Sequence, residues 1–127
     1  MSYVRRISTT VTTAADGSAT AYLPASMSVI NGLLDRILYT KIDFADGVDF
    51  TITLEATGEG IWTQENVNAS AAVAPRQATH DAAGAAALYA GAGQAVRDRI
   101  AVGNDRLKIV IAAGGVAKTG TFTAVFV

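Results

Sequence analysis

Residues 48–56 place the strongest constraint on the fold, because their side chains alternate strictly between apolar and polar. The apolar members are Val48, Phe50, Ile52, Leu54 and Ala56, and the polar members are Asp49, Thr51, Thr53 and Glu55. Successive side chains of a β-strand point to opposite faces of a sheet. The segment therefore predicts a strand with one face on a core and the other toward water or a partner.

Turn signals divide the N-terminal third into further strands. Residues 3–13 are rich in Thr and Val, which favour strands, and Ala15-Asp16-Gly17-Ser18 is typical of a tight turn. Residues 18–23 then predict a return strand that ends at Pro24, so we expect these two strands to form a β-hairpin.

Residues 24–32 predict a loop or a single helical turn, with Gly32 as the stop signal. Residues 33–43 fit both helical spacing and strand composition. We interpret them as a strand, because a turn at 45–47 and another strand follow directly.

The C-terminal half shows the same alternation of strands and turns. The predicted strands are 61–65, 95–102, 106–113 and 121–127, and the predicted turns are 58–60, 103–105 and 114–120. In total the chain predicts an all-β fold of about eight strands, either an antiparallel β-sandwich or a jelly roll.

Residues 66–95 differ in composition from the rest of the chain. Alanine takes 13 of the 27 positions from 69 to 95, and Pro75 with several glycines interrupts any helix. We interpret the segment as an extended connection, with a possible short helical turn near 82–90. A long connection in a compact domain is usually functional, so the segment is the first place to look for a partner.

Composition limits the classes of function. The 127 residues predict one domain, 1–127, and their formal net charge of −1 with no like-charged block gives no footprint for nucleic acid or a membrane surface. No apolar run approaches the ~18 residues of a membrane helix, and no signal peptide is predicted. Only 17% of residues are charged, which suggests that neighbouring chains cover part of the surface.

The candidate chemical groups do not form a recognisable site. His80 beside Asp81 lacks both companion metal ligands and a Gly-x-Ser-x-Gly nucleophile motif, so local hydrogen bonding is the favoured interpretation. The cluster of Asp43, Asp46 and Asp49 lacks the closing Glu of a calcium loop and favours turn chemistry.

A pair of carboxylates is typical of glycosidases, and three glutamates are candidates for such a pair. Glu55, Glu59 and Glu65 have no defined separation and favour a solvated surface. We therefore predict no catalytic residue, no cofactor and no metal, and hence no enzyme. The candidate partner-contacting residues are Trp62, Arg76, His80 and Tyr89.

Several stretches together resemble small structural proteins of tailed bacteriophages. They are Thr-Thr-Ala-Ala-Asp-Gly-Ser-Ala-Thr (12–20), Asp-Phe-Ala-Asp-Gly-Val-Asp-Phe-Thr-Ile-Thr (43–53), Ile-Trp-Thr-Gln-Glu-Asn-Val-Asn-Ala-Ser (61–70), Pro-Arg-Gln-Ala-Thr-His-Asp (75–81), Asn-Asp-Arg-Leu-Lys-Ile-Val-Ile-Ala (104–112) and Lys-Thr-Gly-Thr-Phe (118–122). Within that class, size and the all-β prediction are most similar to capsid decoration, or cement, proteins.

The resemblance implies a virion protein on the outer capsid surface, assembled in the host cytoplasm. It implies binding to the major capsid protein as a homo-oligomer, dimer or trimer, which stabilises the capsid lattice. Two alternatives remain open at this point. One is another phage component of the tail, adaptor or head fibre. The other is a carbohydrate-binding β-sandwich that uses Trp62 and Tyr89 as stacking platforms.

Overall fold

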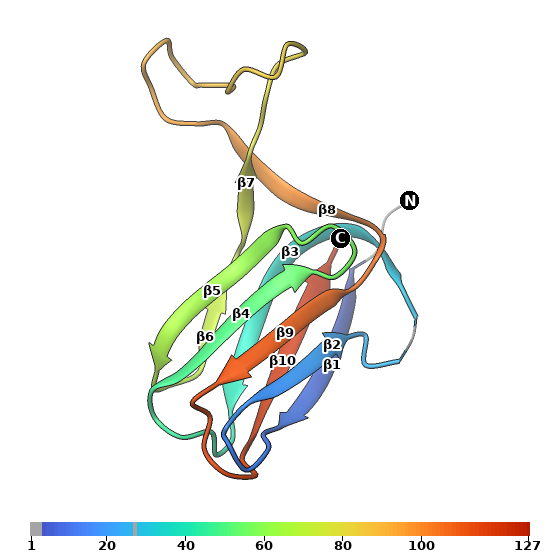
Figure 1. The fold of residues 1–127 in the computed structure, drawn as a ribbon. Helices are drawn as coiled ribbons and strands as arrows, with labels where there is room; N and C mark the ends of the chain where they lie inside the picture. The colour runs from blue at the N-terminus through green and yellow to red at the C-terminus, as the bar shows by residue number, and fades with distance from the viewer. Residues whose placement is uncertain (1–3, 27) are drawn as a thin grey trace.

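A computed structural model describes residues 4–26 and 28–127, and its fold is a two-layer β-sandwich with one projecting arm (Figure 1). Every pair of neighbouring strands is antiparallel, and the described residues contain no helix. The predicted all-β class is confirmed. The strands number ten rather than about eight, because two short strands form inside the predicted connection.

The ten strands divide between two sheets. Their bounds are β1 Arg5–Thr12, β2 Ala19–Leu23, β3 Ile30–Lys41, β4 Val48–Leu54, β5 Gly60–Val67, β6 Ala71–Val73, β7 Arg76–Ala78, β8 Arg97–Asp105, β9 Leu107–Ala112 and β10 Thr119–Phe126. The first sheet has the order β1-β10-β3-β8-β7, with β6 also paired to β3. The second sheet has the order β2-β9-β4-β5. We call them sheet A and sheet B.

The predicted alternation of residues 48–56 is confirmed in β4. Val48, Phe50, Ile52 and Leu54 are buried in the core, whereas Thr51 is exposed on the outer face of sheet B. The strand ends at Leu54, so Ala56 lies beyond it. Its neighbour β9 buries Leu107, Ile109 and Ile111 in the same layer, which completes the inner face at the centre of sheet B. 

An aromatic cluster joins the two sheets. Tyr39 of β3 and Phe122 of β10 belong to sheet A, and Phe50 of β4 and Trp62 of β5 belong to sheet B. Phe50 lies 5.3 Å from Tyr39, 5.2 Å from Phe122 and 4.7 Å from Trp62 between ring centroids. Tilted and edge-on rings at these separations attract one another beyond the effect of burial alone. Phe50 is therefore the central contact between the layers.

The predicted hairpin of the first two strands is wrong. The turn itself forms, with a hydrogen bond from the Gly17 N–H to the Ala14 carbonyl (3.0 Å). The strands on either side of it then enter different sheets, β1 beside β10 and β2 beside β9. Thr13 fixes this crossing, because its hydroxyl donates to the Gly115 carbonyl (2.7 Å) and accepts from the Lys118 N–H (2.9 Å).

The predicted turn at 103–105 is also wrong, because these residues lie inside β8. Between Val102 and Asp105, β8 has one more residue than the facing part of β3, which makes a β-bulge. Asn104 adopts a positive φ of 52°, and its N–H donates to the Asn31 side chain (2.7 Å). The turn-forming residues therefore bend a strand instead of ending it.

Gly32 likewise does not stop a helix. Residues 24–29 form no helix where the structure describes them, and β3 begins at Ile30 and contains Gly32. Gly32 lies at the same bulge with φ 150°, and a Cβ there would come within 3.4 Å of the Val127 carbonyl oxygen. The predicted strand at 33–43 is confirmed, but its bounds are shifted, because β3 begins at Ile30 and ends at Lys41.

The Tyr39 hydroxyl offers a test of the core. It is buried, finds no hydrogen-bond partner among the described residues, and burial raises its pKa. A buried, unpaired hydroxyl costs free energy because it has lost its water. We expect Tyr39→Phe to raise the free energy of unfolding by about 1 kcal/mol, measured by urea denaturation.

Tyr89→Phe removes the same hydroxyl from an exposed side chain and serves as the control. Its free energy of unfolding should change by less than about 0.5 kcal/mol. A lower stability for Tyr39→Phe would show that the hydroxyl has a bound partner in solution.

Candidate partner interface

Residues 76–99 project from the sandwich as an arm, which Figure 1 shows above the two sheets. The arm consists of β7, the segment 79–96 and the first residues of β8. Within it Gln77 pairs with Asp98, and Ala78 pairs with Arg97. From Ile100 onward the same strand β8 pairs with β3. One continuous strand thus belongs to both the arm and sheet A.

Asp35 of β3 holds the base of the arm. Its carboxylate accepts a hydrogen bond from Arg99 Nε (2.9 Å) and lies 3.5 Å from Arg76 Nη2. Its backbone carbonyl accepts a second bond from Arg76 Nη1 (2.9 Å). Arg76 and Arg99 are directly opposite in the β7–β8 pair, where like charges repel. Asp35 therefore compensates the two cations that face each other.

The same contacts affect the ionisation of Asp35. The hydrogen bond from Arg99 is the main cause that holds the pKa of this carboxyl below its usual value of 3.8, and the charges of Arg99 and Arg76 add to it. A lowered pKa means that the folded protein favours the carboxylate. The ionised Asp35 carboxylate therefore stabilises the folded protein fully above pH 3.8, and this stabilisation is lost as the pH falls through the lowered pKa.

Backbone hydrogen bonds organise the outer part of the arm. Thr79 donates to Val96, Val96 donates to Ala87, and Ala87 donates to Thr79, each through the backbone N–H at 2.9 to 3.0 Å. The Asp81 carboxylate closes a turn by accepting the N–H groups of Ala83 and Ala85. The helical turn considered near 82–90 is wrong, because this region forms turns and isolated bridges.

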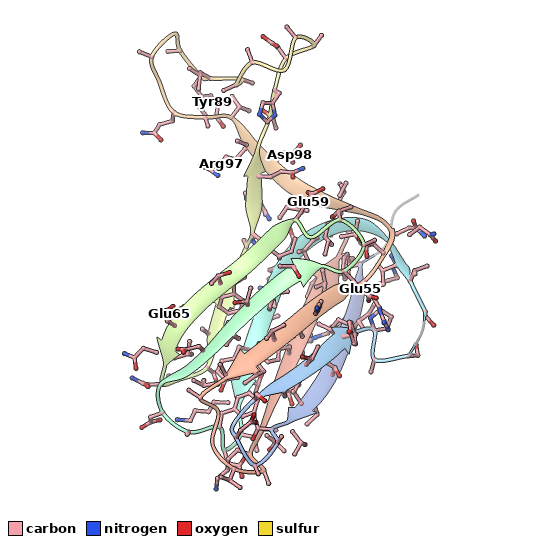
Figure 2. All side chains as sticks on the ribbon, in the orientation of Figure 1. Glu55, Glu59, Glu65, Tyr89, Arg97 and Asp98 are labelled. Atoms are coloured by element: carbon pink, nitrogen blue, oxygen red, sulfur yellow. The ribbon has the colours of Figure 1, made fainter. Side chains whose placement is uncertain are left out.

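The surface of the arm is uncharged and exposed. Residues 82–95 contain no Asp, Glu, Lys or Arg, and most of them are exposed. Tyr89 is 75% exposed and Leu88 is 39% exposed. Figure 2 shows Tyr89 in the outer part of the arm, and the charged Arg97 and Asp98 closer to the sandwich. Small side chains let another backbone approach closely, and an exposed tyrosine adds a large contact area.

The four candidate contact residues have different environments. Arg76 lies at the base of the arm, and His80 and Tyr89 are exposed on it. Trp62 is distant from them in the core, where it is 8% exposed and packs edge-on against Phe50. Its indole N–H donates to the Gln64 side chain (2.9 Å). Trp62 and Tyr89 therefore do not form a shared stacking surface for a sugar.

Asp35 and Arg99, which hold the base of the arm, are not among the residues that the sequence singles out. Both belong to the repeated triplet Asp-Arg-Ile, at 35–37 and 98–100. The Asp of the first triplet binds the Arg of the second. The repetition was the available signal, although it gave no reason to pair those two residues rather than others.

The acidic candidates have separate structural contacts. Asp43 accepts the N–H (2.6 Å) and hydroxyl (3.0 Å) of Thr119, and these bonds lower its pKa. Lys41 pairs with Asp46, and Asp49 accepts the Asn66 N–H. Across residues 4–26 and 28–127, no three His, Cys, Asp or Glu side chains are placed together to hold a metal ion.

Glu55, Glu59 and Glu65 lie at separate places on the sandwich in Figure 2. Glu55 forms an ion pair with Arg106, whose guanidinium lies 3.9 Å from the centre of the Tyr22 ring. This pair borders an open hollow of about 190 Å³ beside the buried carboxylate of Asp105. Asp105 Oδ1 accepts the Ala56 and Arg106 N–H groups, so it organises the local backbone.

A scan against protein-family models found no match for this chain, and searches of curated proteins and of solved structures found none. In the part of the chain that the structure describes, no helix is long and apolar enough to cross a membrane.

The Asp35 contacts predict how Asp35→Asn behaves. Loss of the charge should increase hydrogen exchange of the Thr79 and Val96 amides roughly two- to fivefold, the effect of a partly exposed ion pair. Amides of the central strand β10 should be unaffected. Exchange at single-residue resolution by NMR at pH 6 measures both, and Glu59→Gln is the control for loss of one negative charge.

The same experiment has a pH dependence. Because the pKa of Asp35 lies below 3.8, the variant and the wild type should converge only as the pH falls below that value. Equal exchange of the arm amides in both proteins at pH 6 would contradict a role for Asp35 in holding the arm.

Proposed function

We propose that this protein is a non-enzymatic structural component of a tailed-phage virion, and that it decorates the outer surface of the capsid. The observation that carries the proposal is the projecting arm with its uncharged surface of small residues and exposed Tyr89. The resemblance of residues 12–20, 43–53, 61–70, 75–81, 104–112 and 118–122 to phage structural proteins gives the class of partner.

The construction of the arm supports a role in binding. A loop that is free in solution loses conformational entropy when it binds, and that loss weakens affinity. Here the Thr79–Val96–Ala87 hydrogen bonds and the Asp35 contacts fix much of the arm beforehand. The arm is thus suited to extend from the sandwich onto an adjacent capsid subunit.

The dispersal of the reactive side chains favours a binding role over catalysis. His80 lies on the arm, the aspartates at 43, 46 and 49 support loops, and Glu55 is paired with Arg106. A role in the tail, adaptor or head fibre would use the same arm and remains the second phage assignment. The carbohydrate alternative has less support, because Trp62 is packed in the core.

Removal of the arm tests the proposal. Thr79 and Val96 are opposite each other, and the Thr79 N–H bonds to the Val96 carbonyl at 2.9 Å. Residues 80–95 can therefore be replaced by Asn-Gly, which forms a two-residue hairpin turn between paired strands. We expect this variant to fold with an unchanged sandwich and to lose binding to empty capsids in a co-sedimentation assay.

Point variants test whether the surface of the arm contacts the capsid while the arm itself stays intact. Tyr89→Ala should weaken capsid binding by roughly tenfold, as for an aromatic side chain central to an interface. Val116→Ala, at an apolar residue of the β9–β10 turn that is 64% exposed, is the control and should bind normally. Full capsid binding by the Asn-Gly variant would show that the arm is not the contact. Absence of wild-type binding would reject decoration itself.

A further inference from the structure

Among residues 4–26 and 28–127, no strand pairs with the outer edge of β1. β1 is the outermost strand of sheet A, with β10 on its one paired side (Figure 1). The Thr13 N–H donates to the carbonyl of Lys118, which lies opposite it in the continued β1–β10 register. Opposite residues of antiparallel strands alternate between hydrogen-bonded and non-hydrogen-bonded pairs, so the odd-numbered residues of β1 make the hydrogen bonds to β10. The even-numbered residues therefore direct their N–H and C=O groups away from the sheet. These residues are Arg6, Ser8, Thr10 and Thr12, and all are exposed.

Charged side chains protect the edge of β1 only at its start, at Arg5 and Arg6, and the rest of the strand lacks the usual protective features. Proteins discourage edge-to-edge pairing with bulges, prolines and charged side chains. β1 pairs with β10 without a register shift, and from Ile7 to Thr12 it contains no charge and no proline. By contrast, the edge strand β5 of sheet B has register shifts along its pairing with β4.

We propose that two copies of this chain associate through β1, antiparallel and centred on Thr9, so that sheet A continues from one copy into the other. This self-association in solution does not depend on the proposed capsid role. In this register Ser8 of one copy faces Thr10 of the other, and Arg6 faces Thr12. All the outward backbone groups of β1 are then paired, in about eight hydrogen bonds.

Charge and burial favour this register. The arginines at positions 5 and 6 are at opposite ends of the paired strands, so no arginine of one copy faces an arginine of the other. Ile7, which is only half-buried in one copy, faces Val11 of the second. A like-charged pair would result if the strands were centred on Arg6.

The neighbouring edge of sheet B leaves room for a second copy. β2 lies beside β1 across the sandwich and is the outermost strand of its own sheet. Its residues nearest the turn are the small Ala19, Thr20 and Ala21. These small side chains do not obstruct a second copy at this end of the edge.

Charged variants test the association. Ser8→Lys/Thr10→Lys places lysines opposite each other twice in the dimer, on exposed positions whose N–H groups are outside the β1–β10 ladder. We expect self-association to weaken by about tenfold or more in sedimentation equilibrium. Thr40→Lys/Thr51→Lys adds the same charge at exposed positions of the inner strands β3 and β4, which do not pair with each other, and should associate like the wild type.

Two further variants test the register. Ser8→Asp/Thr10→Lys places opposite charges across the pair and should restore association. The chain has no cysteine, so Thr9→Cys gives one thiol per copy, and the two would meet at the centre, about 4.5 Å apart between Cα atoms. Oxidation should link these copies, whereas Thr12→Cys should not form the link.

The possible results are decisive. Concentration-dependent dimers that the lysine pair disrupts and the Asp/Lys pair restores support the proposal. A wild-type protein that remains monomeric at about 100 µM would overturn it, as would dimers that Ser8→Lys/Thr10→Lys leaves unchanged. A dimer that Thr12→Cys cross-links better than Thr9→Cys would overturn the register. Capsid binding by a monomer would leave the proposed function standing and reject only the dimer.

Discussion

The contact of Phe50 with Tyr39 and Phe122 is the interaction on which the rest of the structure depends. These three rings, from β4, β3 and β10, are the point where sheet B meets sheet A. Burial of apolar surface is the main driving force of folding, and these large rings bury much of it at one place. The long strand β3 is fixed by this contact along one half, and its other half receives β8 and thus positions the arm.

The molecule therefore separates its tasks. The sandwich holds the large apolar side chains, and the arm has small side chains that contribute little to the core. Besides the continuous strand β8, the contacts that connect them are polar and involve one aspartate on β3 and two arginines. This arrangement allows the surface of the arm to vary without loss of the fold, as expected of a binding element on a rigid scaffold.

Local sequence patterns predicted the strands better than their partners. The alternation in β4 and the composition of β10 gave both strands, because each depends on one buried face. The pairing of β1 with β10 joins the two ends of the chain, and no local signal near Asp16-Gly17 distinguishes it from a hairpin. Gly103-Asn104 favours a turn and a bulge equally, since both need a positive φ. The Asp35 contacts also join residues that are distant in the sequence. The connection was therefore predicted as a segment, but the contacts that attach the arm to β3 were not.

The continuity of β8 has a mechanical consequence. Hydrogen bonds between antiparallel strands lie perpendicular to the strand direction. A pull on the arm along β8 therefore loads the bonds from Ile100 to Asp105 together, in shear, instead of opening them one after another. The bulge at Asn104 and the bond to Asn31 resist sliding of β8 past β3. The arm is thus attached as a tether that carries tension into sheet A along the covalent chain.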